Sequence, residues 1–106
     1  MSTASDEARR ERRVRDEMIA DGWSFIMRAA ASKGPADLAM AHPDYGLALV
    51  QVGSKSKTLG PADRDRLCDA AELCSALPLL AVIRPREKTR TWVVDRGKPS
   101  RWAVWA

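Results

Sequence analysis

The sequence predicts an α/β fold: one small domain over residues 1–106, in which a mixed, twisted sheet of about four or five strands has a helix on either side. Three observations predict it. A helical pattern near the N-terminus ends at a glycine, short strand patterns with tight connections follow, and a second helix that opens on a proline precedes a strongly apolar strand. A length of 106 residues also favours one domain with one core.

The first predicted helix covers residues 5–20. Ser5 and the acidic residues after it begin the helical pattern, and Gly22 is expected to cap the C-terminal end. The stripe expected to pack inward follows i, i+3, i+4, i+7 spacing and consists of Glu11, Val14, Arg15 and Met18. It places a carboxylate, Glu11, among core positions. That carboxylate either pairs with an arginine of its own helix or belongs to a functional site.

Three strand patterns follow this helix. Residues 23–28 alternate with a period of two, which is typical of a strand, and residues 38–41 form a second short strand. Turn-forming residues fill 42–46. The next segment, 47–52, is nearly all apolar, as expected of a central strand that is covered on both faces.

The second half of the chain begins with a helix that has Pro61 at its first helical position. Its predicted apolar stripe consists of Leu67, Ala70, Ala71 and Cys74. The pair Leu77-Pro78 is expected to end this helix, and residues 79–83 read as a buried strand. Residues 91–94 and 102–105 are predicted to form further strands near an edge of the sheet.

Charge and cysteine content limit the classes of function. The chain has 18 Lys and Arg residues against 14 Asp and Glu residues, a formal net charge of +4. This balance favours a polyanionic partner, with a solvated basic surface as the alternative. Cys68 and Cys74 lie within the second helix without zinc-site spacing, so we expect reduced thiols in a cytoplasmic protein. No apolar run approaches the length of a membrane span or a signal-peptide core, which argues against a membrane partner.

The residues that could bind a metal ion lie around the central strand. Asp37 follows the rigid Gly34-Pro35 loop and begins a strand. On the central strand Gln51, Gly53 and Lys55 share one face because side chains alternate. Mg²⁺ binds oxygen ligands from one or two carboxylates together with waters, and Asp37 is suited to that role. Gln51 can add a carbonyl oxygen without charge, whereas Gly53 adds no side chain.

The order of these motifs resembles the archaeal-type Holliday junction resolvases and their bacteriophage relatives, members of the PD-(D/E)xK nuclease superfamily. The resemblance covers roughly residues 9–83. The matching motifs are Glu11-Arg12 with Asp21-Gly22-Trp23 after it, Arg28 and Ser32 before Asp37, Gln51-Val52-Gly53 at the family's Glu-x-Lys or Gln-x-Lys position, and a helix and a Pro-bearing strand up to Ile83. The resemblance implies a PD-(D/E)xK nuclease-like fold and a homodimer that binds four-way or branched DNA and cuts two opposing strands with Mg²⁺ or Mn²⁺.

The resemblance also implies roles for individual residues. Glu11 and Asp37 would be metal ligands, Gln51 a neutral third ligand, and Ser32 part of a loop that faces DNA. Gly53 departs from the family pattern, which has a lysine there, and Lys55 is the predicted substitute because it lies about 6.6 Å farther along the same face. The residues expected to contact DNA are all basic: Arg9, Arg10, Arg12, Arg13, Arg28 and Lys33.

Two other functions remain open at this point. The loss of the motif lysine at Gly53 would also fit a DNA-binding module that has kept the fold and lost cleavage. A structural or regulatory protein with no role on DNA is the third possibility. If the resemblance to phage resolvases holds, the cytoplasm would be that of a phage-infected bacterial host.

Overall fold

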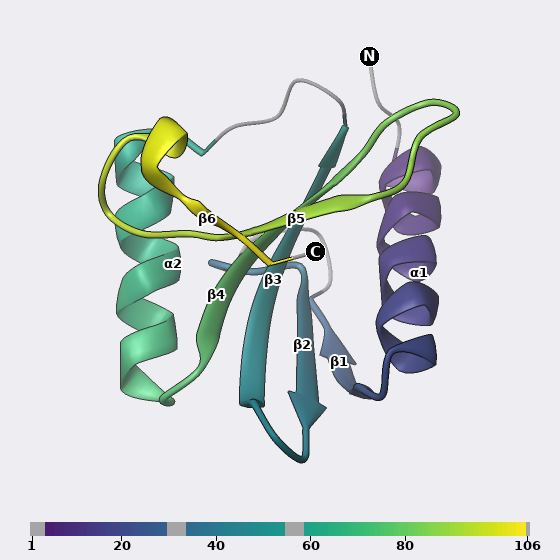
Figure 1. Ribbon diagram of the computed structural model, residues 1–106, viewed down its shortest axis with the longest axis horizontal. Helices are drawn as coiled ribbons and strands as arrows, with labels where there is room; N and C mark the ends of the chain where they lie inside the picture. Colours follow the sequence, from purple (N-terminus) through teal and green to yellow (C-terminus); the bar gives the residue numbers. More distant parts are fainter. Residues whose placement is uncertain (1–3, 30–33, 55–58, 106) are drawn as a thin grey trace.

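The computed structural model describes residues 4–29, 34–54 and 59–105 (Figure 1). Their elements are, in order, α1 (Ala4–Ala20), β1 (Ser24–Arg28), β2 (Leu38–His42), β3 (Gly46–Ser54), α2 (Pro61–Leu73), β4 (Leu77–Ile83), β5 (Arg90–Val93), the short 3-10 helix η2 (Pro99–Arg101) and β6 (Ala103–Val104). This order confirms the predicted α/β fold class. Neither helix in these ranges is long and apolar enough to cross a membrane.

The strands form one mixed sheet in the order β1-β2-β3-β4-β5-β6. Neighbours are antiparallel except β3 and β4, which run parallel and are connected through α2. The sheet has six strands, one more than the upper end of the prediction. The last of them, β6, consists of Ala103 and Val104, which pair with Val93 and Trp92. A strand was predicted over 102–105 near an edge of the sheet, and β6 confirms that place over fewer residues.

The two helices cover opposite faces of the sheet, as predicted (Figure 1). On one face Val14 of α1 packs with Val50 and Leu79. On the other face Leu67 of α2 packs with Leu80, the next residue along β4. This alternation explains why the central strands read as almost continuously apolar: successive side chains enter two different cores.

The end of α1 follows the sequence prediction. Gly22 has a φ of +101°, a conformation that side chains rarely adopt, and a Cβ at this position would lie 3.1 Å from Nε2 of His42. The amide of Gly22 donates to the carbonyl oxygen of Ile19 at 3.1 Å. Glycine is therefore required here both by the backbone conformation and by the close approach of His42.

The second helix agrees with the prediction at its start and differs at its end. Pro61 occupies the first turn, as predicted. The buried side of α2 consists of Arg64, Leu67, Cys68 and Ala71, whereas Cys74, predicted to lie on the apolar stripe, is exposed. The stripe prediction fails there because the helix ends at Leu73 and the chain turns at Ser75, which has a φ of +54°. Leu77 begins β4 instead of ending the helix, and both cysteines are free.

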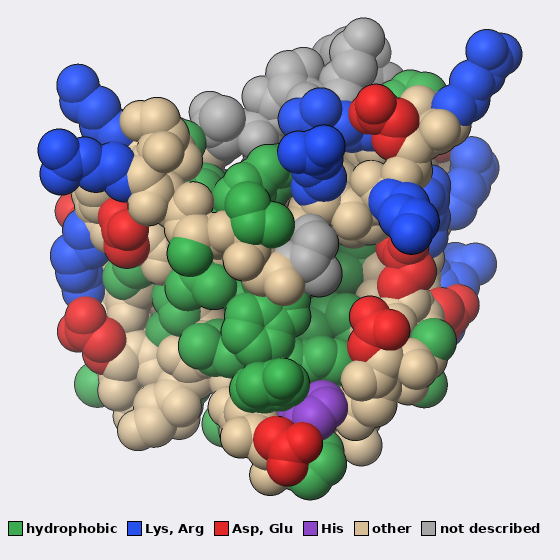
Figure 2. Space-filling model, in the orientation of Figure 1, with side chains coloured by type: hydrophobic (Ala, Val, Ile, Leu, Met, Phe, Trp, Pro, Cys, Tyr) green, Lys and Arg blue, Asp and Glu red, His purple; other side chains and the backbone are tan. Residues whose placement is uncertain are grey.

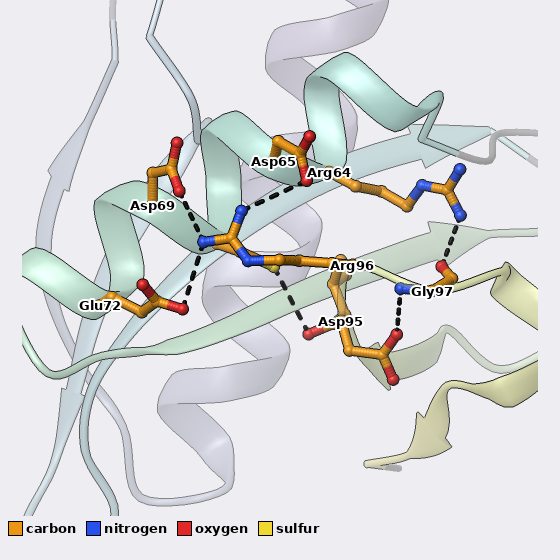
Figure 3. Close-up of polar contacts among 9 residues, drawn as sticks. Arg64, Asp65, Asp69, Glu72, Asp95, Arg96 and Gly97 are labelled. Carbon is orange, nitrogen blue, oxygen red and sulfur yellow. Dashed lines mark hydrogen bonds and ion pairs between the residues drawn. The ribbon is translucent and has the colours of Figure 1, made fainter.

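Arginines tie the C-terminal segment to α2 (Figure 3). Arg96 forms ion pairs with three carboxylates of α2, at 3.3 Å from Asp65, 2.6 Å from Asp69 and 3.2 Å from Glu72. Its hydrogen bonds to Asp69 and Glu72 raise the pKa of Arg96, so this side chain stays charged. The buried Arg64 donates from Nη1 to the carbonyl oxygen of Gly97 at 2.5 Å. These contacts hold α2 in a defined orientation against the segment that follows β5.

Candidate active site

A cavity of about 350 Å³ lies between α1, the C-terminal end of β3 and the first turns of α2. It is lined by four residues of the predicted metal-binding motifs: Glu11, Asp37, Gln51 and Gly53. The structure therefore brings the predicted metal ligands, which come from α1, the loop before β2, and β3, to one polar cavity.

Asp37 is fixed by the backbone of the central strand. Its side chain is buried, with 6% of the residue exposed, and its Oδ2 accepts a hydrogen bond from the amide of Val52 at 2.8 Å. Its own amide donates to the carbonyl oxygen of Val50, also at 2.8 Å. Asp37 immediately precedes β2, so the sheet itself holds this carboxylate at the wall of the cavity.

Glu11 is the most buried acidic residue of the site, with 3% of its surface exposed. Its Oε1 accepts a hydrogen bond from Nε of Arg28 at 2.5 Å. Burial raises the pKa of Glu11 and the negative charge of Asp37 raises it further, while the hydrogen bond from Arg28 acts in the opposite direction. The prediction that Glu11 faces inward is confirmed. Its partner is Arg28 of β1 and not an arginine of its own helix, which was the alternative expected from the sequence.

Gln51 links β3 to the loop before Asp37. Its Nε2 donates to the carbonyl oxygen of Pro35 at 2.8 Å, and no described residue donates to its side-chain oxygen. Gln51 follows Val50, which pairs with Leu38, the residue after Asp37. Gln51 and Asp37 both line the cavity.

The donors of this cavity suit a hydrated divalent ion. Two carboxylates and one amide oxygen match the preference of Mg²⁺ for one or two protein carboxylates with several retained waters. Within the described ranges, no group of three or more His, Cys, Asp and Glu side chains is placed to hold a metal ion. Glu11, Asp37 and Gln51 could therefore hold an ion whose remaining ligands are water or substrate, and they do not form an all-protein cage.

The other predicted site residues lie in three different situations. Ser32, Lys33 and Lys55 fall outside the described residues. Arg10 lines the cavity, and Arg28 is held by Glu11. The three remaining arginines, Arg9, Arg12 and Arg13, are exposed on α1.

Some of these exposed arginines have acidic neighbours. Arg9 lies 3.8 Å from Asp6, and Arg13 lies 3.7 Å from Glu17. Pairs this exposed contribute little to stability and leave the guanidinium groups accessible to other partners. In Figure 2 most Lys and Arg side chains lie in the upper part of the visible face, on both the α1 side and the α2 side of the molecule.

Four polar or charged residues of the cavity were not recognised as site residues from the sequence: Glu7, Ser54, Asp63 and Arg66. Glu7 precedes Glu11 by one helical turn, and this spacing could have indicated it. Asp63 is the acidic residue in the first turn of α2. Arg66 has no local sequence signal, because its place on the cavity wall depends on how α2 packs against the sheet.

The fold is similar to that of a solved structure, Archaeoglobus fulgidus Hjc, a Holliday junction resolvase from an archaeal hyperthermophile. The TM-score is 0.68, and the match covers 81% of this chain and 75% of that chain at 21% sequence identity. The fold is resolvase-like. At this identity the likeness concerns the fold alone, and no family model and no curated protein matches the sequence.

Proposed function

We propose that this protein is a structure-selective endonuclease that hydrolyses phosphodiester bonds of four-way or branched DNA with Mg²⁺ or Mn²⁺. The observation that carries the proposal is the convergence of Glu11, Asp37 and Gln51 on one cavity within a resolvase-like fold. These donor types are those used where a divalent ion assists phosphate-ester hydrolysis.

Each cavity residue has its own proposed role in the reaction. A divalent ion held there would neutralise charge on the phosphate and lower the pKa of the attacking water. Asp37 offers its carboxylate from a fixed position, because the amide of Val52 restrains Oδ2. Glu11 adds a second carboxylate whose orientation depends on Arg28. Gln51 holds the loop before Asp37 through Pro35 and contributes a neutral oxygen.

The basic surface supports DNA as the partner. The net charge is +4, and the exposed arginines of α1 lie on the helix whose inner side carries Glu11. Contacts between these arginines and DNA phosphates would release counterions from the DNA, so the affinity for DNA should fall steeply with salt. Ser32 and Lys33 remain proposed DNA contacts in the loop before Asp37.

We also propose that the protein acts as a homodimer, since cutting two opposing strands needs two cavities. The edge strand β1 supports this because three consecutive apolar side chains are exposed on it: Phe25 at 40%, Ile26 at 49% and Met27 at 57%. A register shift between Phe25 and Met27 interrupts the backbone ladder. Side-chain packing, rather than an extended sheet, is therefore the expected mode of contact.

The competing function is a DNA-binding module without cleavage, which Gly53 favours because this residue brings no side chain to the cavity. Both functions require DNA binding, and a structural or regulatory protein with no role on DNA would bind none at low salt. The test is incubation with labelled four-way, forked and linear duplex DNA in Mg²⁺, in Mn²⁺ and in chelator. Metal-dependent cutting that favours the branched substrates supports the nuclease. Binding without cutting in either metal supports the module.

A further inference from the structure

Two arginines line the cavity beside Gly53, one from each helix. Arg10 belongs to α1 and Arg66 to α2. Because α1 and α2 cover opposite faces of the sheet, the two guanidinium groups approach the cavity from different sides. The cavity therefore has cationic side chains even though the strand position at Gly53 offers none.

The two arginines differ in their present contacts. Arg10 follows Arg9 and precedes the buried Glu11, and it has no ion pair or hydrogen bond with any residue of the described ranges. Arg66 lies 3.9 Å from Asp63, with both side chains more than half exposed. An exposed ion pair of this length adds little to stability, so the pairing with Asp63 by itself does not hold Arg66 away from a phosphate.

The electrostatics of the cavity require such cations if a nucleic acid strand is to enter. Four carboxylates line it: Glu7, Glu11, Asp37 and Asp63. A phosphodiester that approached this wall without a nearby cation would be repelled. A guanidinium group suits the task because its planar set of donors matches two phosphate oxygens and its charge does not change over the working pH range.

We infer that Arg10 and Arg66 clamp the phosphate of the DNA strand in the cavity and supply the positive charge that Gly53 cannot. This inference rests on the proposed nuclease function and adds two specific substrate contacts to it. The two arginines are thus an alternative to Lys55 as the source of positive charge, and Lys55 itself lies outside the described residues.

The experiment compares the unmodified protein with seven variants: Arg10→Ala, Arg66→Ala, the double Ala variant, Arg10→Lys, Arg66→Lys, Lys55→Ala, and Arg66→Ala combined with Gly53→Lys. Arg101→Ala is the matched control, because it removes one charge from an exposed arginine that does not line the cavity. Thermal melting of each variant verifies folding. Junction affinity is measured in chelator over a salt series, and single-turnover cleavage is measured with Mg²⁺ at saturating protein.

The expected results distinguish an effect on the cleavage rate from an effect on the affinity for the junction. Loss of either cavity arginine should slow cleavage by about 100-fold at saturating protein, as for other donors that stabilise transition-state charge. Each loss should lower the slope of log affinity against log salt by about 0.9, the value for one phosphate contact on duplex DNA. The Lys variants should retain part of the rate, and Gly53→Lys should partly rescue Arg66→Ala. Arg101→Ala should cleave at the unmodified rate.

Failure of the inference can be told apart from failure of the proposed function. Unmodified protein that binds the junction without cutting it contradicts the nuclease, and the salt slopes then still decide whether the two arginines contact phosphate. A double Ala variant with unchanged rate and unchanged salt slope overturns the inference and leaves the nuclease intact. The same holds if Lys55→Ala abolishes cleavage while the double Ala variant keeps it. No DNA binding at low salt contradicts both.

Discussion

The carboxylate of Asp37 accepts a hydrogen bond from the backbone amide of Val52 at 2.8 Å. The bond joins the loop before β2 to the central strand β3, next to Gln51 and Gly53. One oxygen of Asp37 is thus committed to the scaffold, which leaves the other for a ligand. This relationship lets a single buried aspartate serve both the fold and the candidate site.

Asp37→Asn should abolish metal binding and cleavage while junction binding is kept or improved. The amide oxygen of asparagine can still accept from Val52, so the local fold should persist. We expect calorimetry to detect no Mn²⁺ binding by this variant. Asp44→Asn, in the exposed turn between β2 and β3, is the matched control and should bind Mn²⁺ normally. Cleavage by Asp37→Asn at the unmodified rate would remove Asp37 from the site.

Glu11→Gln should change how stability depends on pH. Burial and the charge of Asp37 raise the folded-state pKa of Glu11, so its favourable contribution is fully present below the unfolded pKa and is lost as pH rises through the folded pKa. Glutamine does not titrate. The variant should therefore gain thermal stability over the unmodified protein as pH rises through the raised folded-state pKa of Glu11. If the melting temperatures of the two proteins differ by the same amount at every pH, Glu11 does not titrate in this way.

Joint replacement of Arg12 and Arg13 with Ala should weaken binding to every duplex substrate. Both side chains are exposed on α1, so the melting temperature should change little. The slope of log affinity against log salt should fall by about 0.9 for each phosphate contact that is lost. Fluorescence anisotropy with a linear duplex and a four-way junction measures both quantities. Unaltered affinity for both would move the DNA-binding face away from this side of α1.

Met27→Lys should convert the proposed dimer to a monomer. The side chain is already exposed in a single chain, so the change should alter the free energy of unfolding by no more than about 0.5 kcal/mol. Light scattering coupled to size exclusion reports the mass. Leu73→Lys provides the control, because Leu73 is 89% exposed on α2, a helix that packs against β3 and β4. A mass that Met27→Lys leaves unchanged would exclude this part of β1 as the interface.

Much of the fold follows from local patterns. Gly22 and Pro61 mark helix ends for reasons that hold in any context: one permits positive φ and the other needs no backbone donor. Cys74 shows where the pattern fails, because helical spacing continues through it while the chain has already turned at Ser75. Residue type alone does not define how far a helix runs when tertiary packing ends it.

The same distinction holds for the candidate site, where some residues could be predicted from local sequence and others could not. Glu11 could be found because a carboxylate among core positions breaks the expected pattern, and it is indeed buried. Its partner Arg28 comes from β1, and that contact depends on how α1 packs against the sheet edge. Arg66 needs still more of the fold, since α2 must cross over the sheet before this side chain reaches the cavity. Contacts between distant elements carry no local signal.

The most direct test of the central claim is single-turnover cleavage of a labelled four-way junction by the unmodified protein and by Asp37→Asn, each with Mg²⁺ and with chelator. The account predicts cuts in two opposing strands by the unmodified protein with Mg²⁺ only, and no cuts by Asp37→Asn, although both proteins bind the junction. Cleavage that persists in chelator or in Asp37→Asn, or an unmodified protein that binds the junction and never cuts it, would contradict the claim.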